Sequence, residues 1–273
     1  MKSKITIDDL KKMSYTEFIS FAHQWNIPPG SFVTLNEWAI FSRINKDSRI
    51  LEIASTTGFS SREIARITGC SAVGIDICPS SVERAIFNQK LYAEDLNLEY
   101  ICMDACNYKT EKKFTHIILG AALGFFKNPE KMIEKLKGLL EDNGMILVSP
   151  YYLKGEKLPK ELIEQTKRII EINPTNFDYY TAIKPYENFE ILYESRKDII
   201  PETEDQMKKY SKDTINKACE LNGITDKKII DYMYERMYEI KNICNELHKY
   251  FGYSVIVLRY RKDIYPNRYV ELF

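Results

Sequence analysis

The stretch that decides the fold is RILEIASTTGFSSREIARITGC, residues 49–70. Its first part, residues 49–54, is a short apolar run typical of a buried strand, and residues 60–68 have helical spacing. After residue 54 come the small residues Ser55, Thr56 and Thr57 and then Gly58. The turn from a strand into a helix leaves backbone N–H groups free to face a ligand, and small side chains let that ligand approach closely. The stretch therefore predicts a ligand-binding turn.

The pattern continues on the carboxyl side of this turn. Short apolar runs alternate with amphipathic segments, which is typical of strand-helix-strand units around a parallel sheet. We expect an α/β fold with a doubly wound, mostly parallel sheet. The predicted strands are residues 49–54, 72–77, 98–103, 116–121 and 144–150, and the predicted helices between them are residues 60–68, 79–96 and 128–144.

The rest of the chain departs from simple alternation. Residues 1–46 have the helical spacing and breaks of an N-terminal helical cap, and residues 47–273 form the sheet-containing domain. Residues 197–251 are expected to be a helical insert, a hairpin of two helices before the last strand. The remaining predicted elements are a helix near 156–172, an aromatic loop at 173–189, a strand at 189–195, helices at 202–222 and 226–250, and a strand at 253–262.

Composition limits the classes of partner. Lys and Arg together number 39, as do Asp and Glu, so no excess of charge favours nucleic acid or an anionic membrane. No apolar run approaches the roughly 18 residues of a membrane span, and the first residues lack the apolar centre of a signal peptide. We expect a cytoplasmic protein. The six cysteines and three histidines show no zinc-site spacing, so no metal is expected.

Carboxylates stand at or near the ends of three predicted strands. Glu52 lies in the first strand, Asp76 ends the second, and Asp104 follows the third. A carboxylate at the end of the second strand accepts hydrogen bonds from paired ribose hydroxyls in dinucleotide folds. The alternative for Asp104 is a cap for the residues that follow it, and for Ser55, Thr56 and Thr57 it is a capping cluster for the next helix.

These residues resemble the class I S-adenosylmethionine-dependent methyltransferases. Residues 52–58 are similar to that family's first motif, an acidic residue followed by x-G-x-G-x-G, with Ala54 and Thr56 at two of the glycine positions. The resemblance implies a seven-stranded sheet whose antiparallel last strand lies beside the fifth, and S-adenosylmethionine as cofactor. It assigns cofactor binding to Glu52, Ala54, Ser55, Thr56, Thr57, Gly58, Asp76, Ile77, Asp104 and Ala105.

A small-molecule acceptor is the favoured substrate, because aromatic residues follow the fourth and fifth strands and a largely apolar, concave site suits such a ligand. The resemblance assigns no catalytic residue. Two alternatives stay open: a non-catalytic cofactor-binding or interaction protein, and methylation of a protein or nucleic acid. A homodimer formed through the helical insert is a further expectation. The candidate substrate residues are Trp38, Phe125, Tyr151, Tyr152, Tyr179 and Tyr180.

Overall fold

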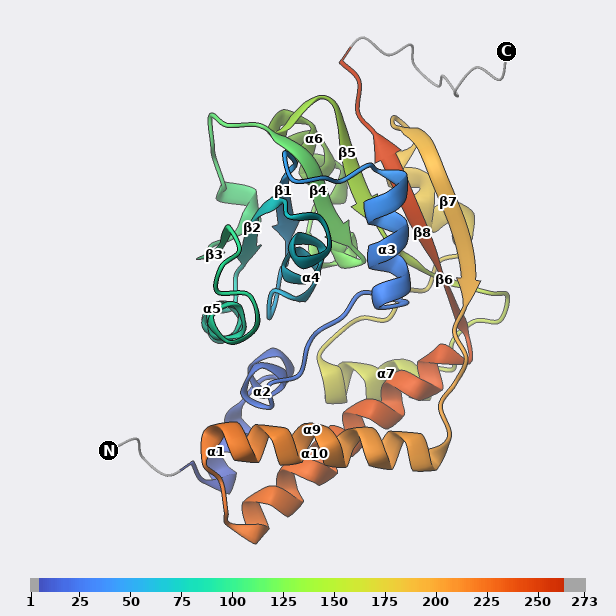
Figure 1. Cartoon of the computed structure of the whole chain (residues 1–273). Coiled ribbons are helices and arrows are strands. Elements are labelled where there is room, and N and C mark those ends of the chain that lie inside the picture. The colour runs from blue at the N-terminus through green and yellow to red at the C-terminus, as the bar shows by residue number, and fades with distance from the viewer. Residues whose placement is uncertain (1–4, 263–273) are drawn as a thin grey trace.

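The computed structural model describes residues 5–262, and its centre is one mixed sheet (Figure 1). Its strands follow the order β3-β2-β1-β4-β5-β8, and β7 pairs with β8. The first five strands are parallel and β8 is antiparallel to its neighbours, as expected for the family the sequence resembles. The bounds are β1 Arg49–Ile53, β2 Ser71–Asp76, β3 Leu98–Cys102, β4 Phe114–Gly120, β5 Leu140–Val148, β7 Glu190–Asp198 and β8 Phe251–Arg259.

A short strand, β6 (Tyr151–Leu153), continues β5 along the same partner. Val148 pairs with Ile256 and Tyr151 pairs with Tyr253, so both segments keep one register against β8. Pro150 separates them because proline has no N–H to donate to a ladder. The two segments therefore occupy one position, and the sheet has the seven positions that the sequence predicts.

Helices cover both faces of the sheet. The cluster that contains Ile50, Leu147 and Val257 packs against α3 (Phe32–Phe41), α4 (Phe59–Thr68) and α5 (Pro79–Tyr92). The opposite face, with Leu51 and Ile146, packs against α6 (Pro129–Leu139) and the short 3-10 turns η1 (Ala105–Asn107), η2 (Ala122–Phe125) and η3 (Lys184–Tyr186). Two covered faces explain why the strands read as nearly continuous apolar runs.

Two local expectations were wrong. The helix predicted for 128–144 ends at Leu139, because Leu140 already pairs with Phe114 as the start of β5. The aromatic loop at 173–189 contains a short helix, α8 (Tyr179–Ile183), whose start is capped by the Asp178 carboxylate accepting the Thr181 N–H at 2.9 Å.

The remaining helices form a layer of their own beyond the sheet (Figure 1). The core of this layer joins residues from both ends of the chain, among them Leu10 and Phe18 with Ile215 and Met237. We call it the helical layer: α1 (Ile7–Lys12), α2 (Tyr15–Phe21), α7 (Lys160–Ile170), α9 (Glu204–Asn222) and α10 (Lys227–His248). The first two helices of the predicted cap thus pack on the predicted insert, whereas α3 packs on the sheet. The domain boundary at residue 46 stays a prediction.

None of the helices within residues 5–262 is long and apolar enough to span a membrane.

Candidate active site

The turn after β1 has the backbone shape of a glycine-rich loop. Ala54, Thr56 and Gly58 all adopt left-handed conformations, with φ of 55°, 45° and 71°. Left-handed backbone costs an L-residue roughly 1–2 kcal/mol, and a β-branched residue such as threonine is rarely found there. These three positions are where the resemblance places glycines, so the turn keeps the shape of the motif although two of its glycines are absent.

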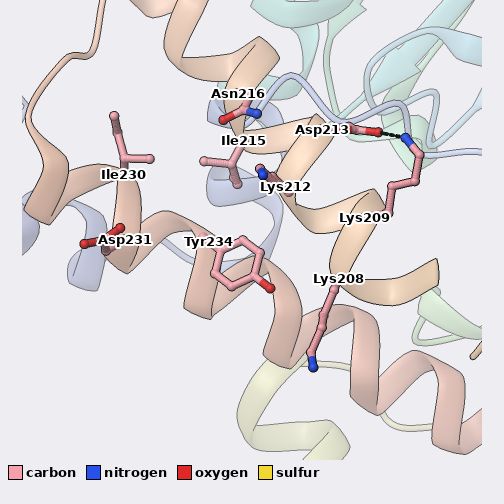
Figure 2. Close-up of a pocket in the computed structure, with 9 residues that line it drawn as sticks. All are labelled: Lys208, Lys209, Lys212, Asp213, Ile215, Asn216, Ile230, Asp231 and Tyr234. Carbon is pink, nitrogen blue, oxygen red and sulfur yellow. Dashed lines mark hydrogen bonds and ion pairs between the residues drawn. The ribbon is translucent and has the colours of Figure 1, made fainter. Parts of the chain in front are cut away.

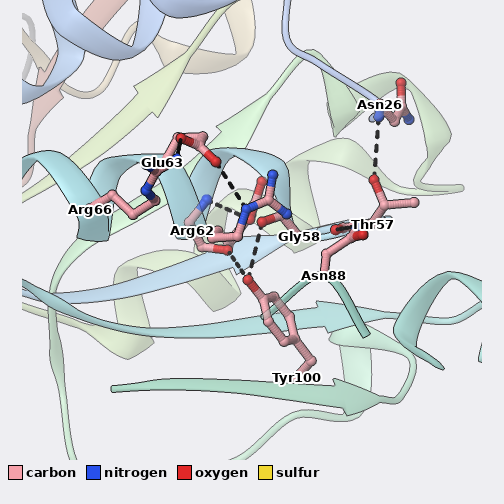
Figure 3. A network of polar contacts seen from close by, with 10 residues as sticks. Asn26, Thr57, Gly58, Arg62, Glu63, Arg66, Asn88 and Tyr100 are labelled. Atoms are coloured by element: carbon pink, nitrogen blue, oxygen red, sulfur yellow. Dashed lines mark hydrogen bonds and ion pairs between the residues drawn. The ribbon is translucent and has the colours of Figure 1, made fainter. Parts of the chain in front are cut away.

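Gly58 is required by space as well as by conformation. A Cβ atom built on Gly58 would lie 2.6 Å from the ring of Tyr100, which packs beneath the turn (Figure 3). The Tyr100 hydroxyl donates to the Gly58 carbonyl at 3.1 Å and lies 3.2 Å from Ser61 Oγ. The Tyr100 side chain of β3 therefore packs against the turn and holds the start of α4 in place.

Asp76, at the end of β2, organises the same turn. Its carboxylate is 7% exposed and accepts the N–H groups of Thr56 and Cys78, each at 2.8 Å. Burial raises the pKa of Asp76, although these backbone hydrogen bonds oppose the shift. An ionised carboxylate has about four lone-pair positions, so two N–H donors leave acceptor capacity for ribose hydroxyls.

Glu52 is buried against the first turn of α4, and its role in cofactor binding stays a prediction. It points from β1 toward α4, is 5% exposed, and accepts the Ser61 N–H at 3.0 Å. Burial raises the pKa of Glu52, against the opposing hydrogen bonds from Ser61 and Ser60. Within the described structure it therefore orients the first turn of α4.

The ends of β2 and β3 expose apolar side chains beside Asp76. Ile77 is 72% exposed and Met103 is 39% exposed, and the Met103 N–H donates to the Asp76 carbonyl at 2.8 Å. The Asp104 carboxylate accepts the Cys106 N–H at 2.8 Å, which is the capping arrangement, and Ala105 is buried. Met103 was not among the predicted site residues; its place between the third strand and Asp104 was the available signal.

The side chains of Thr57 and Ser55 lie in different surroundings. The Thr57 hydroxyl donates to the Gln24 carbonyl at 3.4 Å and accepts the Asn26 N–H at 3.3 Å, and the Thr57 carbonyl accepts Asn88 Nδ2 at 3.1 Å (Figure 3). Ser55 Oγ is buried and has no hydrogen-bond partner in the described part of the chain. Thr57 thus fastens the turn to the N-terminal segment, which sequence reasoning missed.

The predicted substrate residues fall into separate groups. Tyr179 contacts Tyr152 and Tyr180 edge to face, with centroids 5.5 and 5.3 Å apart. Its hydroxyl donates to Glu194, and the Arg196 guanidinium lies 3.6 Å above its ring. Three of the predicted aromatics are therefore one cluster beside β6 and β7.

The other three lie apart from that cluster. Tyr151 packs on Phe251 at 5.7 Å, and burial raises the pKa of its hydroxyl, which lies near Cys244 of α10. Phe125 is 64% exposed after β4. Trp38 is fully buried between α3 and the sheet, so it does not face a ligand as a substrate residue would. Its apolar ring packs in the core there.

An open hollow of about 610 Å³ lies between α9 and α10 (Figure 2). Its walls carry charges of both signs, and Lys209 forms an ion pair with Asp213. Tyr234, also in its wall, stacks on Tyr238. None of its lining residues comes from a strand end, so we do not place the cofactor there.

The parallel sheet with its antiparallel strand β8, the left-handed turn after β1 and the carboxylate ending β2 define the class I S-adenosylmethionine-dependent methyltransferase fold. Residues 50–144 match the family described as a methyltransferase domain. Residues 50–144 therefore carry a methyltransferase domain, for which the resemblance of the sequence implies S-adenosylmethionine as the cofactor. The residues at the edge fit that cofactor: a turn that allows close approach, an acceptor for ribose, and exposed apolar side chains.

Individual proteins show the same likeness. Malonyl-[acyl-carrier protein] O-methyltransferase 1 of Ilyobacter polytropus is 32% identical over 120 residues, which are 44% of this chain and 42% of that protein. The crystal structure of MccD protein is 29% identical, with a TM-score of 0.70, over 87% of this chain and 100% of that one. A Geobacter sulfurreducens S-adenosylmethionine-dependent methyltransferase, solved with S-adenosyl-L-homocysteine, shares the fold: TM-score 0.64 and 18% identity over 89% and 96% of the two chains.

Proposed function

We propose that the protein transfers the methyl group of S-adenosylmethionine to a small-molecule acceptor. The observation that carries this proposal is the turn at residues 54–58, which keeps left-handed backbone at all three glycine positions and is bonded to the Asp76 carboxylate. Strained backbone is typically found at functional sites. The strain in this turn therefore supports ligand binding at this edge of the sheet. An interaction protein that binds no cofactor would have no reason to keep a shape that costs free energy, and the transfer assay below separates an enzyme from a non-catalytic cofactor-binding protein.

The chemistry asks little of the side chains. The cofactor, when bound, supplies an electrophilic methyl group on a sulfonium. A lone pair of the acceptor forms the new bond to that carbon, the carbon–sulfur pair stays on sulfur, and the acceptor proton leaves to water. The protein has to align the acceptor and exclude bulk water. Asp76 would hold the ribose, and Ile77 and Met103 would flank the adenine.

The acceptor class is inferred from the helical layer and the charge balance. The layer is joined to the sheet edge through residues of α2 and the following segment, for instance by the Ser20–Ser81 contact at 3.0 Å. A layer of helices fastened beside the edge favours a small acceptor over a folded macromolecule. The net charge of zero removes the usual attraction to nucleic acid.

The test begins with binding of S-adenosylhomocysteine by calorimetry. Asp76→Ala should weaken binding by at least about tenfold, because two charge-assisted hydrogen bonds to ribose are lost. The control is Asp178→Ala, which removes a carboxylate that accepts a backbone N–H at the start of α8. Absence of binding by the wild-type protein would refute the proposal and favour the interaction-protein alternative.

Binding is followed by transfer of radiolabelled methyl groups into cell extract separated by size. Label in the small-molecule fraction, absent with Asp76→Ala, supports the proposed acceptor class. Label only in protein or nucleic acid would show that the acceptor is a macromolecule and would overturn this part of the proposal.

A further inference from the structure

The outer face of α3, which runs along one side of the sheet, is almost entirely apolar (Figure 1). Asn36 is the one exposed polar residue within Phe32–Phe41. Glu37, the charged residue of this helix, is turned toward β7, where its carboxylate lies 2.7 Å from Lys197 Nζ. A helix that is apolar on all sides is typically buried. The large apolar side chains of this outer face are nevertheless 44–67% exposed: Phe32, Val33, Ile40 and Phe41.

Three residues form a line along the middle of this face. Val33, Asn36 and Ile40 are spaced i, i+3 and i+7, so their side chains follow one another along the helix. At 3.6 residues per turn, Phe32 and Phe41 lie on opposite sides of this line. An apolar line with one amide at its middle therefore faces solvent.

The two phenylalanines join this line to the neighbouring elements. Phe32 contacts Phe59 of α4 edge to face, with ring centroids 5.4 Å apart, and Phe41 stacks on Tyr193 of β7 with centroids 3.6 Å apart. The apolar surface is thus continuous from α4 across α3 to β7. We call it the α3 patch and define it by its members: Phe32, Val33, Asn36, Ile40, Phe41 and Tyr193.

The α3 patch is large enough for the centre of a protein interface. Apolar side chains of this size have roughly 150–250 Å² of surface each, so those on α3 leave roughly 400 Å² exposed. The largest apolar patch of a monomeric protein is about 300–600 Å² and is often functional. An interface of standard size buries about 800 Å² on each partner, somewhat more than half of it apolar. The α3 patch with a polar rim matches one side of such an interface.

The chemistry of the patch indicates a second copy of this chain as the partner. Since none of its members is charged, it fits an apolar, uncharged surface, and the patch itself is such a surface. Two of these lines can pack antiparallel about a two-fold axis, with Val33 against Ile40 of the second copy. The two Asn36 side chains then meet at the axis, where each amide can both donate and accept. A lipid or a purely apolar partner would leave that amide unpaired, which costs free energy.

We propose that the α3 patch is the interface of a two-fold dimer of this chain, in which the two α3 helices pack antiparallel. Two-fold dimers are the most common assemblies of soluble proteins. The inference does not depend on the proposed function, because no residue of the cofactor turn takes part. The competing surface is the helical insert, which the sequence suggests for a homodimer.

The experiment is sedimentation equilibrium of the full chain. The wild-type protein should be mostly dimeric at about 10 μM. Val33→Asp and Ile40→Lys should each weaken the dimer at least about 100-fold, because each variant places unpaired charges in an apolar interface. The double variant should regain at least about tenfold, since the carboxylate at position 33 then faces the ammonium at position 40 of the second copy. Within one helix these positions are about 10 Å apart, so the rescue reports contact between copies.

The matched control is Leu91→Lys, which adds a charge at an apolar side chain that is 49% exposed on α5. It should leave the dimer unchanged. Circular dichroism checks that each variant is folded. If Val33→Asp or Ile40→Lys does not fold, Asn36→Asp replaces an exposed side chain by one of nearly the same shape. It should weaken the dimer at least about tenfold, because two carboxylates meet at the axis.

A wild-type protein that stays monomeric would overturn the inference, and so would a dimer that the α3 variants leave intact. Loss of the dimer in Tyr234→Lys but in none of the α3 variants would place the interface on the helical insert instead. A double variant as weak as the single ones would refute the antiparallel arrangement. Sedimentation of monomeric protein with phosphatidylcholine vesicles would show that the patch binds lipid, which also overturns the inference.

Discussion

The left-handed conformation of Thr56 predicts that glycine at this position stabilises the protein. Relief of the left-handed backbone should gain roughly 1–2 kcal/mol, and the greater freedom of glycine in the unfolded chain should cost about 0.4–1 kcal/mol. The net expectation for Thr56→Gly is a gain of about 0.5–1 kcal/mol, or roughly 2 °C in Tm. Urea unfolding followed by circular dichroism measures this difference in the free energy of unfolding.

A matched pair separates the conformational effect from loss of a methyl group. Ala54 and Ala182 are both half-buried, but Ala54 has φ of 55° whereas Ala182 lies within α8. Ala182→Gly should lose about 1 kcal/mol, as glycine does in helices. Ala54→Gly should be nearly neutral, because the relieved strain offsets the same loss. Equal destabilisation by the two substitutions, or destabilisation by Thr56→Gly, would refute the reasoning.

Two further predictions concern the contacts between layers. Burial lowers the pKa of His23 from 6.5 to about 4. The unfolded chain therefore takes up the proton first, and the free energy of unfolding should fall as pH drops from 6.5 to 4. Urea unfolding of His23→Gln at several pH values should show a flatter profile, and parallel profiles would contradict the assignment. Arg236 donates hydrogen bonds to the carbonyls of Leu10 and Met13, and its guanidinium lies 4.4 Å from the centroid of the Phe18 ring. Arg236→Met should lower the free energy of local unfolding by about 2 kcal/mol and speed hydrogen exchange in residues 7–21. The control Arg168→Met changes an exposed arginine and should leave this hydrogen exchange unchanged. Equal exchange rates in the two variants would argue against the role of Arg236.

Much of the sheet could be predicted from sequence because its signals are local. The apolar run at 49–54 and Asp76 at the end of a second run place the turn and its carboxylate together, since parallel strands end at one edge. The resemblance also indicated the antiparallel last strand. The border between α6 and β5 was missed because the pairing of Leu140 with Phe114, which ends the helix, is a tertiary contact.

The site could be predicted only in part. Residue preferences exclude left-handed backbone for Ala54 and Thr56, so the shape of the turn could be known only from its surroundings. The contacts of Thr57 with Gln24 and Asn26 gave no signal, because these partners lie 33 and 31 residues away in the chain. Trp38 was misplaced because an apolar helix face before the first strand fits both a substrate site and a core element.

The helical layer also imposes an order on folding during synthesis. Phe21 and His23 bond to Asn222, and Arg236 bonds to residues 10 and 13, so the first two helices find their partners about 200 residues later in the chain. At about 5–20 residues per second, translation takes on the order of 10–40 s to supply them. During that time the apolar faces of α1 and α2, including Leu10 and Phe18, lack most of their native cover. The nascent N-terminus is therefore where a chaperone would have the longest opportunity to bind.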